Sequence, residues 1–172
     1  MSDTTTIYTT MGSPIGELTL TGDGVAITGL YMERASGEPV ARAGWRRDDE
    51  ALRGAREQVE AYFAGELTAF DLLLAPRGTP FQEKVWEALR AIPYGATASY
   101  RDIAGRVGNP TAVRAVGAAN GRNPISIVIP CHRVIGADGS LTGYGGGMER
   151  KRWLLDLEQR VVGKAAPVLV GV

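Results

Sequence analysis

The only cysteine and the only histidine of this chain are neighbours, Cys131 and His132. A thiolate is a strong nucleophile, but a free thiol has a pKa of about 8.5 and must be helped to lose its proton near neutral pH. A histidine that accepts this proton would give the cysteine that help. Successive side chains on a strand point to opposite faces, so contact between them would require a bend after Pro130 or a bridging water. Taken singly, a lone cysteine is more often an inert core residue.

Glu158 is the third residue that could take part in this chemistry. It shares the apolar face of a predicted helix with Leu154, Leu155 and Val161. A carboxylate on such a face is costly unless it has a partner. His132 would be a suitable partner, because Glu158 could fix its tautomer while the other ring nitrogen takes the thiol proton. Periodicity alone leaves a solvent-exposed edge position for Glu158 equally open.

A glycine-rich segment, residues 143–147, follows the cysteine. The chain has neither the G-x-x-x-x-G-K-[ST] pattern of a phosphate loop nor a strand–G-x-G-x-x-G–helix unit with a suitable acidic residue. We therefore interpret these glycines as a flexible wall beside a pocket, and we expect no nucleotide cofactor.

The elements that must position these residues are mainly helical. Thr79, Pro80 and Gln82 form the pattern of a capping box, followed by a helix that ends before Pro93. Ser99 begins a second, short helix that ends at Gly108, and residues 109–121 form a third helix that starts at Asn109-Pro110. Two short helices joined by a tight turn are typical of a helix-turn-helix.

The third helix is made almost entirely of small residues, with Arg114 its only long polar side chain. Side chains that read sequence in the major groove are usually Arg, Asn or Gln. Small residues would instead allow a close approach to a groove without reading sequence, or simply tight packing in the core. On composition alone, core packing is favoured.

The rest of this half is predicted as a buried strand over 125–129, a β-wing over 133–144 around a turn at 137–139, and a last helix over 148–160. The tail from Val162 has no clear period, so we expect order to about residue 160. In the first half of the chain, the residue pattern predicts strands over 6–11, 16–21 and 25–32. It also predicts a helix over 48–64, which starts at Asp48, and a short strand over 70–74.

Pro76-Arg77-Gly78 interrupts the chain at the point where its charge balance reverses. Residues 1–77 carry 12 acidic and 7 basic side chains, whereas residues 78–172 carry 7 acidic and 12 basic ones. We therefore place a domain boundary there, with a domain over 1–77 and another over 78–172. The excess of positive charge in the second half favours a polyanionic partner, although charges scattered over solvated faces explain it equally well.

Composition excludes some classes of protein. The chain is 44% hydrophobic and 22% charged, as expected of a globular protein, and has no apolar run of the roughly 20 residues that span a bilayer. Its first residues lack the pattern of a secretory signal. A single cysteine allows no internal disulfide and no cysteine-rich zinc site, so we expect a reducing cytoplasm and no metal. The lack of an apolar run leads us to expect no membrane partner.

The segment Ile129-Pro130-Cys131-His132-Arg133-Val134-Ile135 resembles the active-site motif of the O6-alkylguanine-DNA alkyltransferases. The similarity covers essentially all of residues 79–160 in the order and spacing of the family, and further matches lie at Pro93-Tyr94-Gly95, Ser99-Tyr100, Gly108-Asn109-Pro110, Arg114-Ala115-Val116-Gly117, Asn120, Asn123-Pro124, Gly143-Tyr144-Gly145-Gly146-Gly147, Leu154-Leu155 and Glu158. In the first half, Ser13-Pro14-Ile15-Gly16 and Tyr62-Phe63 with Gly65 are similar to the small α/β domain of that family. The implied fold is α+β, with a short antiparallel sheet in the N-terminal domain and a winged-helix-like helix-turn-helix domain after it.

The resemblance implies a role for residues at matching positions. Cys131 would attack the alkyl carbon on guanine O6, and His132, a water and Glu158 would remove the thiol proton. Asn123 would hold the active-site segment, and Tyr100 would donate to the departing guanine and help to rotate the nucleotide outward. Arg114 would fill the vacancy in the base stack. The resemblance also implies DNA contacts and pocket walls, with Tyr100, Arg101, Thr111, Ala112, Arg114 and Ala115 at the DNA and Pro130, Val134, Tyr144 and Gly145 around the pocket.

The partner implied is double-stranded DNA that contains O6-alkylguanine, with O4-alkylthymine left open, bound by a monomer that could assemble cooperatively along DNA. No cofactor is expected, and relatives with a zinc site in the first domain differ, because here no cysteine lies outside position 131. Two other classes remain open: a non-enzymatic helix-turn-helix protein that binds DNA or flags lesions, and a cysteine hydrolase, for which we identify no oxyanion hole.

Overall fold

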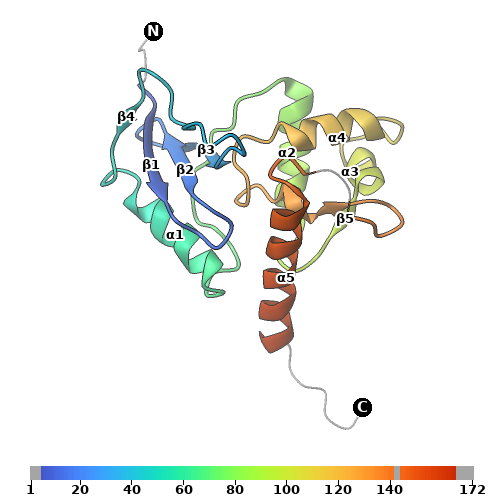
Figure 1. Cartoon of the computed structure of the whole chain (residues 1–172). Helices are drawn as coiled ribbons and strands as arrows, with labels where there is room; N and C mark the ends of the chain where they lie inside the picture. The colour runs from blue at the N-terminus through green and yellow to red at the C-terminus, as the bar shows by residue number, and fades with distance from the viewer. Residues whose placement is uncertain (1–4, 142–143, 166–172) are drawn as a thin grey trace.

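The computed structural model describes residues 5–141 and 144–165. In Figure 1 the sheet and its helix lie on the left, and the remaining helices lie on the right. No helix among the described residues is both long enough and apolar enough to cross a bilayer.

The first part is a four-stranded sheet in the order β3-β2-β1-β4, with one helix packed on it. β1 (Ile7–Met11), β2 (Leu18–Gly22) and β3 (Ile27–Met32) pair antiparallel, as expected. The short β4 (Arg46–Arg47) pairs parallel with β1, so the sheet is mixed rather than purely antiparallel. α1 (Arg53–Phe63) packs on this sheet through Ala55, Val59 and Tyr62.

Two predictions for this part are wrong in detail. The helix does not begin at Asp48, because the backbone N–H of Asp48 donates to Tyr8 O and its carboxylate accepts from Ala51 N in a separate turn. The strand predicted over 70–74 is reduced to one bridge, between Leu74 and Ile27. The Ile27 N–H donates to Leu73 O, and the Ala75 N–H donates to Ile27 O. These two hydrogen bonds hold the segment at the edge of β3.

The second part begins with two helices whose start signals are confirmed. α2 (Pro80–Arg90) has the predicted capping box between Thr79 and Gln82, and α3 (Tyr100–Arg106) has the same arrangement between Ser99 and Asp102. α4 (Val113–Gly121) starts later than predicted, because residues 109–112 form a turn closed by the Ala112 N–H on Asn109 O. The three helices pack on one another.

The segment after α4 differs most from expectation. Ile125, Ile127 and Ile129 are buried as predicted, but the segment makes only single bridges and Ile127 has a φ of 73°, so no strand forms. A β-branched residue in this region is uncommon and bends the chain. The 3₁₀ helix η1 (Cys131–Arg133) follows directly.

The predicted wing is not a hairpin in the described residues. β6 (Val134–Ile135) pairs parallel with β5 (Ala98–Ser99), and the predicted turn is present, closed by the Gly136 N–H on Ser140 O. Residues 142–143 of this segment lie outside the described residues. α5 (Met148–Ala165) is longer than predicted and continues past residue 160.

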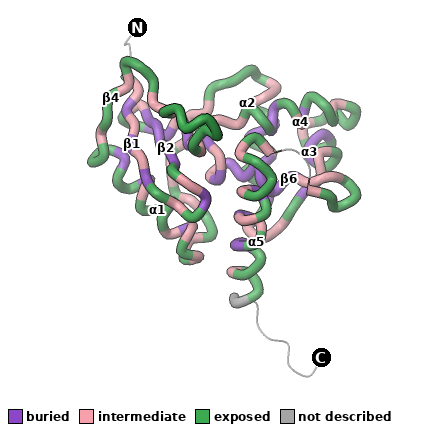
Figure 2. Tube along the Cα trace, in the orientation of Figure 1, coloured by how far each residue is buried: buried purple, intermediate pink, exposed green. Residues whose placement is uncertain are grey.

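One hydrophobic cluster joins both parts. It contains Leu18 and Leu30 of the sheet, Ile125 and Ile127 of the bent segment, and Leu154 of α5. In Figure 2 the purple, buried stretches run from the strands into the region around α5 and β6, while the outer turns are green. The division at residues 77 and 78 stays a prediction, because this core is continuous across it.

Candidate active site

A buried carboxylate on α5 is the centre of the site. Glu158 is 1% exposed and accepts hydrogen bonds from five donors, which come from three other segments of the chain. Its Oε2 lies 2.7 Å from His132 Nε2, 2.7 Å from the Tyr62 hydroxyl and 3.0 Å from Arg133 Nη2. Its Oε1 lies 2.8 Å from Arg133 Nε and 3.1 Å from Gly95 N. The predicted contact between Glu158 and His132 is therefore present, and the alternative of an exposed edge position is wrong.

These contacts determine the protonation states of Glu158 and His132. Burial by itself raises the pKa of the Glu158 carboxyl, but the hydrogen bonds and charges of His132 and Arg133 outweigh it and bring the pKa to about 2. Burial lowers the pKa of His132, although Glu158 acts in the opposite direction. At neutral pH an ionised Glu158 thus faces a neutral imidazole, and Nε2, which faces the carboxylate, carries the ring proton.

The turn of η1 sends its side chains in different directions. Cys131 lines a cavity of about 710 Å³, whereas His132 is fully buried against Glu158. His132 Nδ1 is buried and has no hydrogen-bond partner within the described part of the chain. Because Nε2 holds the proton, Nδ1 is the nitrogen that can accept one. The bend that the sequence left open is therefore present, as a 3₁₀ turn after Pro130.

Two asparagines hold this turn in place. Asn123 Nδ2 donates to Ile129 O at 2.7 Å, and its Oδ1 accepts from Ile125 N at 3.0 Å. Asn120 Nδ2 donates to Cys131 O at 3.3 Å. Asn123 thus contacts the backbone on either side of the bend before Cys131, and its role in holding the active-site segment stays a prediction. Asn120 carried no predicted role, although it belongs to the matching motif.

Burial raises the pKa of the Cys131 thiol, and the side chains of Asn123 and Tyr144 and the charge of Lys151 only partly oppose this. The resting thiol therefore keeps its proton at neutral pH. Lys151 is itself fully buried and donates to Val134 O at 2.6 Å.

The rate at which iodoacetamide alkylates the native protein should therefore still be rising above pH 8.5. Only the thiolate reacts, and a raised pKa moves the midpoint above that of a free cysteine, which is about 8.5. Intact mass measured over a pH series gives the rate without ambiguity, since Cys131 is the sole cysteine. The urea-unfolded chain is the control, and a native midpoint at or below the unfolded one would contradict the assignment.

Both halves of the chain line the cavity. Four residues that were predicted as catalytic or pocket positions line it: Tyr100, Asn123, Tyr144 and Gly145. Residues 31–35 also line the cavity, which the sequence did not indicate, and Met32 lies beside Gly146 of the glycine segment. Two predicted pocket residues are misplaced: Pro130 borders a separate cavity, and Val134 is fully buried in the core.

Arg150 connects the N-terminal part to the glycine segment. Its Nε donates to Ile15 O at 3.0 Å, and its Nη1 lies 3.2 Å from Glu33 O and 3.4 Å from Gly146 O. The N-terminal part is thus tied to the glycine segment at the rim of the cavity. No feature of the sequence indicated this residue, because two of its partners, Ile15 O and Glu33 O, are backbone atoms distant in the chain.

The residues predicted to contact DNA lie on α3, on α4 and in the turn of residues 109–112 that joins them. The side chains of Arg101, Thr111, Arg114 and Ala115 are exposed, and Ala112 is partly buried. Tyr100 begins α3 and lies against Gly117 of α4, where an added Cβ would be 3.9 Å from its ring. The alternative that α4 packs only in the core is incomplete, because Val116, Ala119 and Asn120 face inward and the arginine faces solvent.

The contacts of Arg133 and Tyr62 with Glu158 were also not predicted from the sequence. Arg133 is buried, and its Nη1 donates to Ile92 O at 2.8 Å in addition to the bonds with Glu158. A signal for Tyr62 was available, because a tyrosine on the apolar face of a helix needs a partner for its hydroxyl.

Within the described residues no group of three or more histidine, cysteine or acidic side chains is placed to hold a metal.

Comparison with known proteins agrees with this arrangement. Residues 80–160 match the family model described as the DNA binding domain of 6-O-methylguanine DNA methyltransferase, and residues 6–76 match its ribonuclease-like domain. The methylated-DNA–protein-cysteine methyltransferase of Mycobacterium tuberculosis (strain H37Rv) is 59% identical over 152 residues, which cover 88% of this chain and 92% of that protein.

Solved structures are similar over nearly the whole chain. The crystal structure of M. tuberculosis O6-methylguanine methyltransferase has a TM-score of 0.85 at 55% identity, covering 95% of this chain and 96% of that one. The structure of M. tuberculosis OGT in complex with DNA has a TM-score of 0.84 at 56% identity, covering 94% and 96%. The chain therefore belongs to the 6-O-methylguanine DNA methyltransferase family.

Proposed function

We propose that this protein repairs DNA directly, by moving an alkyl group from O6 of guanine in duplex DNA to Sγ of Cys131. The observation that carries the proposal is the buried contact between a neutral His132 and an ionised Glu158, directly beside a cysteine that lines a cavity. That pairing leaves Nδ1 free to act as a base. The relatives named as methylated-DNA–protein-cysteine methyltransferases and the DNA complex of M. tuberculosis OGT support the substrate class.

The transfer is a displacement at the alkyl carbon. The thiol proton passes to His132 Nδ1 through a water, an S–C bond forms, and the C–O6 bond breaks with its electrons left on guanine. Tyr100, on the cavity wall, donates a hydrogen bond to the departing base, and the proton taken up by His132 returns through water to the guanine anion, which leaves as neutral guanine. Glu158 stabilises the imidazolium through its bond to Nε2, so the positive charge forms next to a fixed negative one.

The alkyl group lies inside the duplex, so the nucleotide must rotate out of the base stack, at a cost of a few kcal/mol. Exposed Arg114 on α4 fills the vacancy, while the small side chains around it allow close approach to the groove. The cavity that receives the guanine is lined by Tyr144 and Gly145 and by residues 31–35.

A thioether on Cys131 has no hydrolytic exit, so each molecule acts once. We propose that a monomer acts on each lesion and that the protein works in a reducing compartment, the cytoplasm, because the reaction consumes a reduced thiol.

Intact mass after incubation with a duplex containing one O6-methylguanine tests the proposal. We expect a gain equal to one methylene group, located on Cys131 by peptide mapping and absent in Cys131→Ser. An unmethylated duplex of the same sequence is the control. A mass that stays unchanged while the duplex is fully bound would show instead a lesion-binding protein without transfer. Repeated turnover with no gain in mass would indicate a hydrolase.

A further inference from the structure

We propose that Tyr62, on α1 in the N-terminal part, is a positioning residue for alkyl transfer, because its hydroxyl holds the same oxygen of Glu158 that binds His132. The inference rests on the proposed function and gives the N-terminal part a direct share in the reaction. Tyr62 acts through Glu158 and touches neither the thiol nor the cavity.

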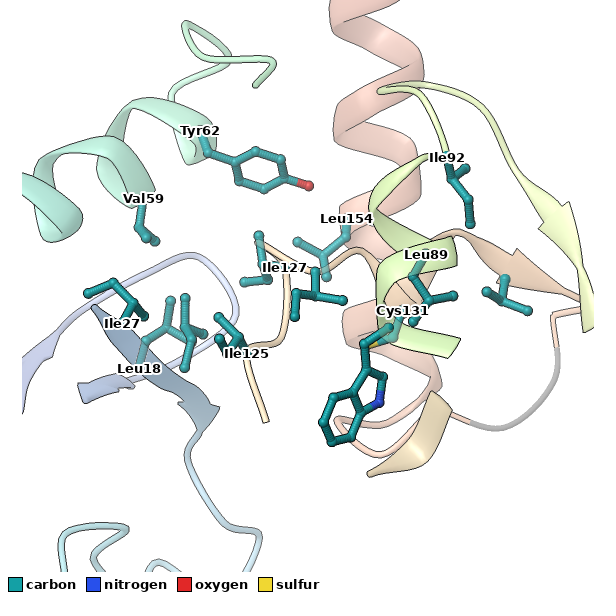
Figure 3. Close-up of a cluster of buried hydrophobic side chains, with 14 of the residues drawn as sticks. Leu18, Ile27, Val59, Tyr62, Leu89, Ile92, Ile125, Ile127, Cys131 and Leu154 are labelled. Carbon is teal, nitrogen blue, oxygen red and sulfur yellow. The ribbon is translucent and has the colours of Figure 1, made fainter. Parts of the chain in front are cut away.

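The contact is short, buried and distant in sequence. Tyr62 is fully buried, and its hydroxyl lies 2.7 Å from Glu158 Oε2, across a separation of 96 residues. Figure 3 shows the ring extending from α1 toward α5, with its oxygen at the end nearest that helix. A hydroxyl in this place donates rather than accepts, because the carboxylate opposite it is ionised.

The ring of Tyr62 is fixed by its aromatic neighbours. It stacks on Phe70 at 5.6 Å between centroids and meets Phe63 and Tyr94 edge-on at 5.5 and 6.2 Å. Because the ring is packed on three sides, the direction of its O–H is set by the fold of the N-terminal part. A donor held in this way fixes the position of Oε2 as well as its charge.

A hydrogen bond to a carboxylate stabilises its charged form and lowers its basicity. The other titratable or charged groups around Glu158 are His132 and Arg133 of η1 and Tyr94 of the segment after α2. Those around His132 are Glu158, Arg133 and Lys151. Tyr62 and His132 both donate to Glu158 Oε2. The hydrogen bond from Tyr62 therefore weakens the one from His132, and it reduces how strongly Glu158 stabilises the imidazolium.

Removal of the donor should therefore make His132 a stronger base. In Tyr62→Phe, the pH midpoint of alkyl transfer from free O6-benzylguanine should rise by roughly half a unit or more, because only the unprotonated imidazole accepts the thiol proton and a stronger base stays protonated to a higher pH. Free O6-benzylguanine separates this effect from base flipping, and the transfer is followed by intact mass over a pH series. The ring, its packing and the remaining donors to Glu158 stay in place.

Tyr94→Phe is the matched control. The Tyr94 hydroxyl is also buried, and it has no hydrogen-bond partner in the described part of the chain, while its ring lies next to that of Tyr62. The same chemical change at this position should leave the pH midpoint where it is in the wild type. Urea unfolding of both variants reports any loss of stability separately.

A second variant tests the sign and replaces the first if Tyr62→Phe fails to fold. Site-specific 3-fluorotyrosine at position 62 is a stronger hydrogen-bond donor and should move the midpoint downward. A role in packing alone would move it in neither variant. Midpoints equal to that of the wild type would overturn the inference on Tyr62, whereas a wild-type protein that takes up no benzyl group would overturn the proposed function itself.

Discussion

Replacement of Glu158 with glutamine should lower the free energy of unfolding by about 3 to 5 kcal/mol, the usual cost of removing one partner of a buried ion pair. An amide has one acceptor oxygen, whereas the carboxylate serves five donors with two. Whichever oxygen is replaced, an NH₂ group faces a buried donor. The guanidinium of Arg133 also loses its counter-charge.

Urea unfolding at pH 7 measures this loss, with Glu149→Gln as the control, because Glu149 is exposed in the first turn of the same helix. The loss should depend on pH in a defined direction. The folded-state pKa of Glu158 is lowered from 4.5 to about 2, so its stabilising effect is complete above the unfolded value and disappears as the pH falls toward 2. The gap between wild type and variant should close over that window. A gap that widens there would contradict the ionised carboxylate.

Replacement of Arg114 with alanine should slow repair of O6-methylguanine in duplex DNA by roughly 10- to 100-fold, because an inserted side chain offsets part of the few kcal/mol lost when a base leaves the stack. The reaction with free O6-benzylguanine needs no flipping and should keep the wild-type rate. Arg114 is exposed on α4 and lies outside the buried network of Glu158, so the thiol and its base are unaffected.

Arg160→Ala is the matched control, since it removes the same charge from an exposed position near the end of α5, away from α4 in Figure 1. Single-turnover rates on both substrates, at two salt concentrations, separate charge from insertion. A general charge effect would appear in both variants and weaken at higher salt. Equal losses on duplex and free base in Arg114→Ala would place this residue in the chemistry rather than in flipping.

Local signals in the sequence predicted the start of two helices. The capping boxes at Thr79 and Ser99 depend on residues three positions apart, so they form wherever the helix lies. Asp48 carried a similar signal and failed, because pairing of its backbone with β1 fixed the segment as extended. A cap is reliable only where no long-range hydrogen bond competes for the same backbone.

The apolar alternation over 125–129 shows the limit of periodicity. It predicted burial of Ile125, Ile127 and Ile129 correctly, because burial follows from side-chain hydrophobicity. It failed to predict the backbone, because a strand also needs a partner strand in register, and this segment finds only single bridges. The bend at Ile127 then leads to the turn that separates Cys131 from His132.

The order of residues alone established the chemistry available to this protein, one thiol beside one imidazole. It offered Glu158 as a partner for that imidazole but left an exposed position for the carboxylate equally open. The tertiary structure alone decided what surrounds them. Tyr62, Gly95 and residues 31–35 reach the site from segments with no local relation to Cys131. Packing of a continuous core places these segments next to the site. Short sequence patterns describe only near neighbours in the chain, so they do not predict contacts between segments this far apart.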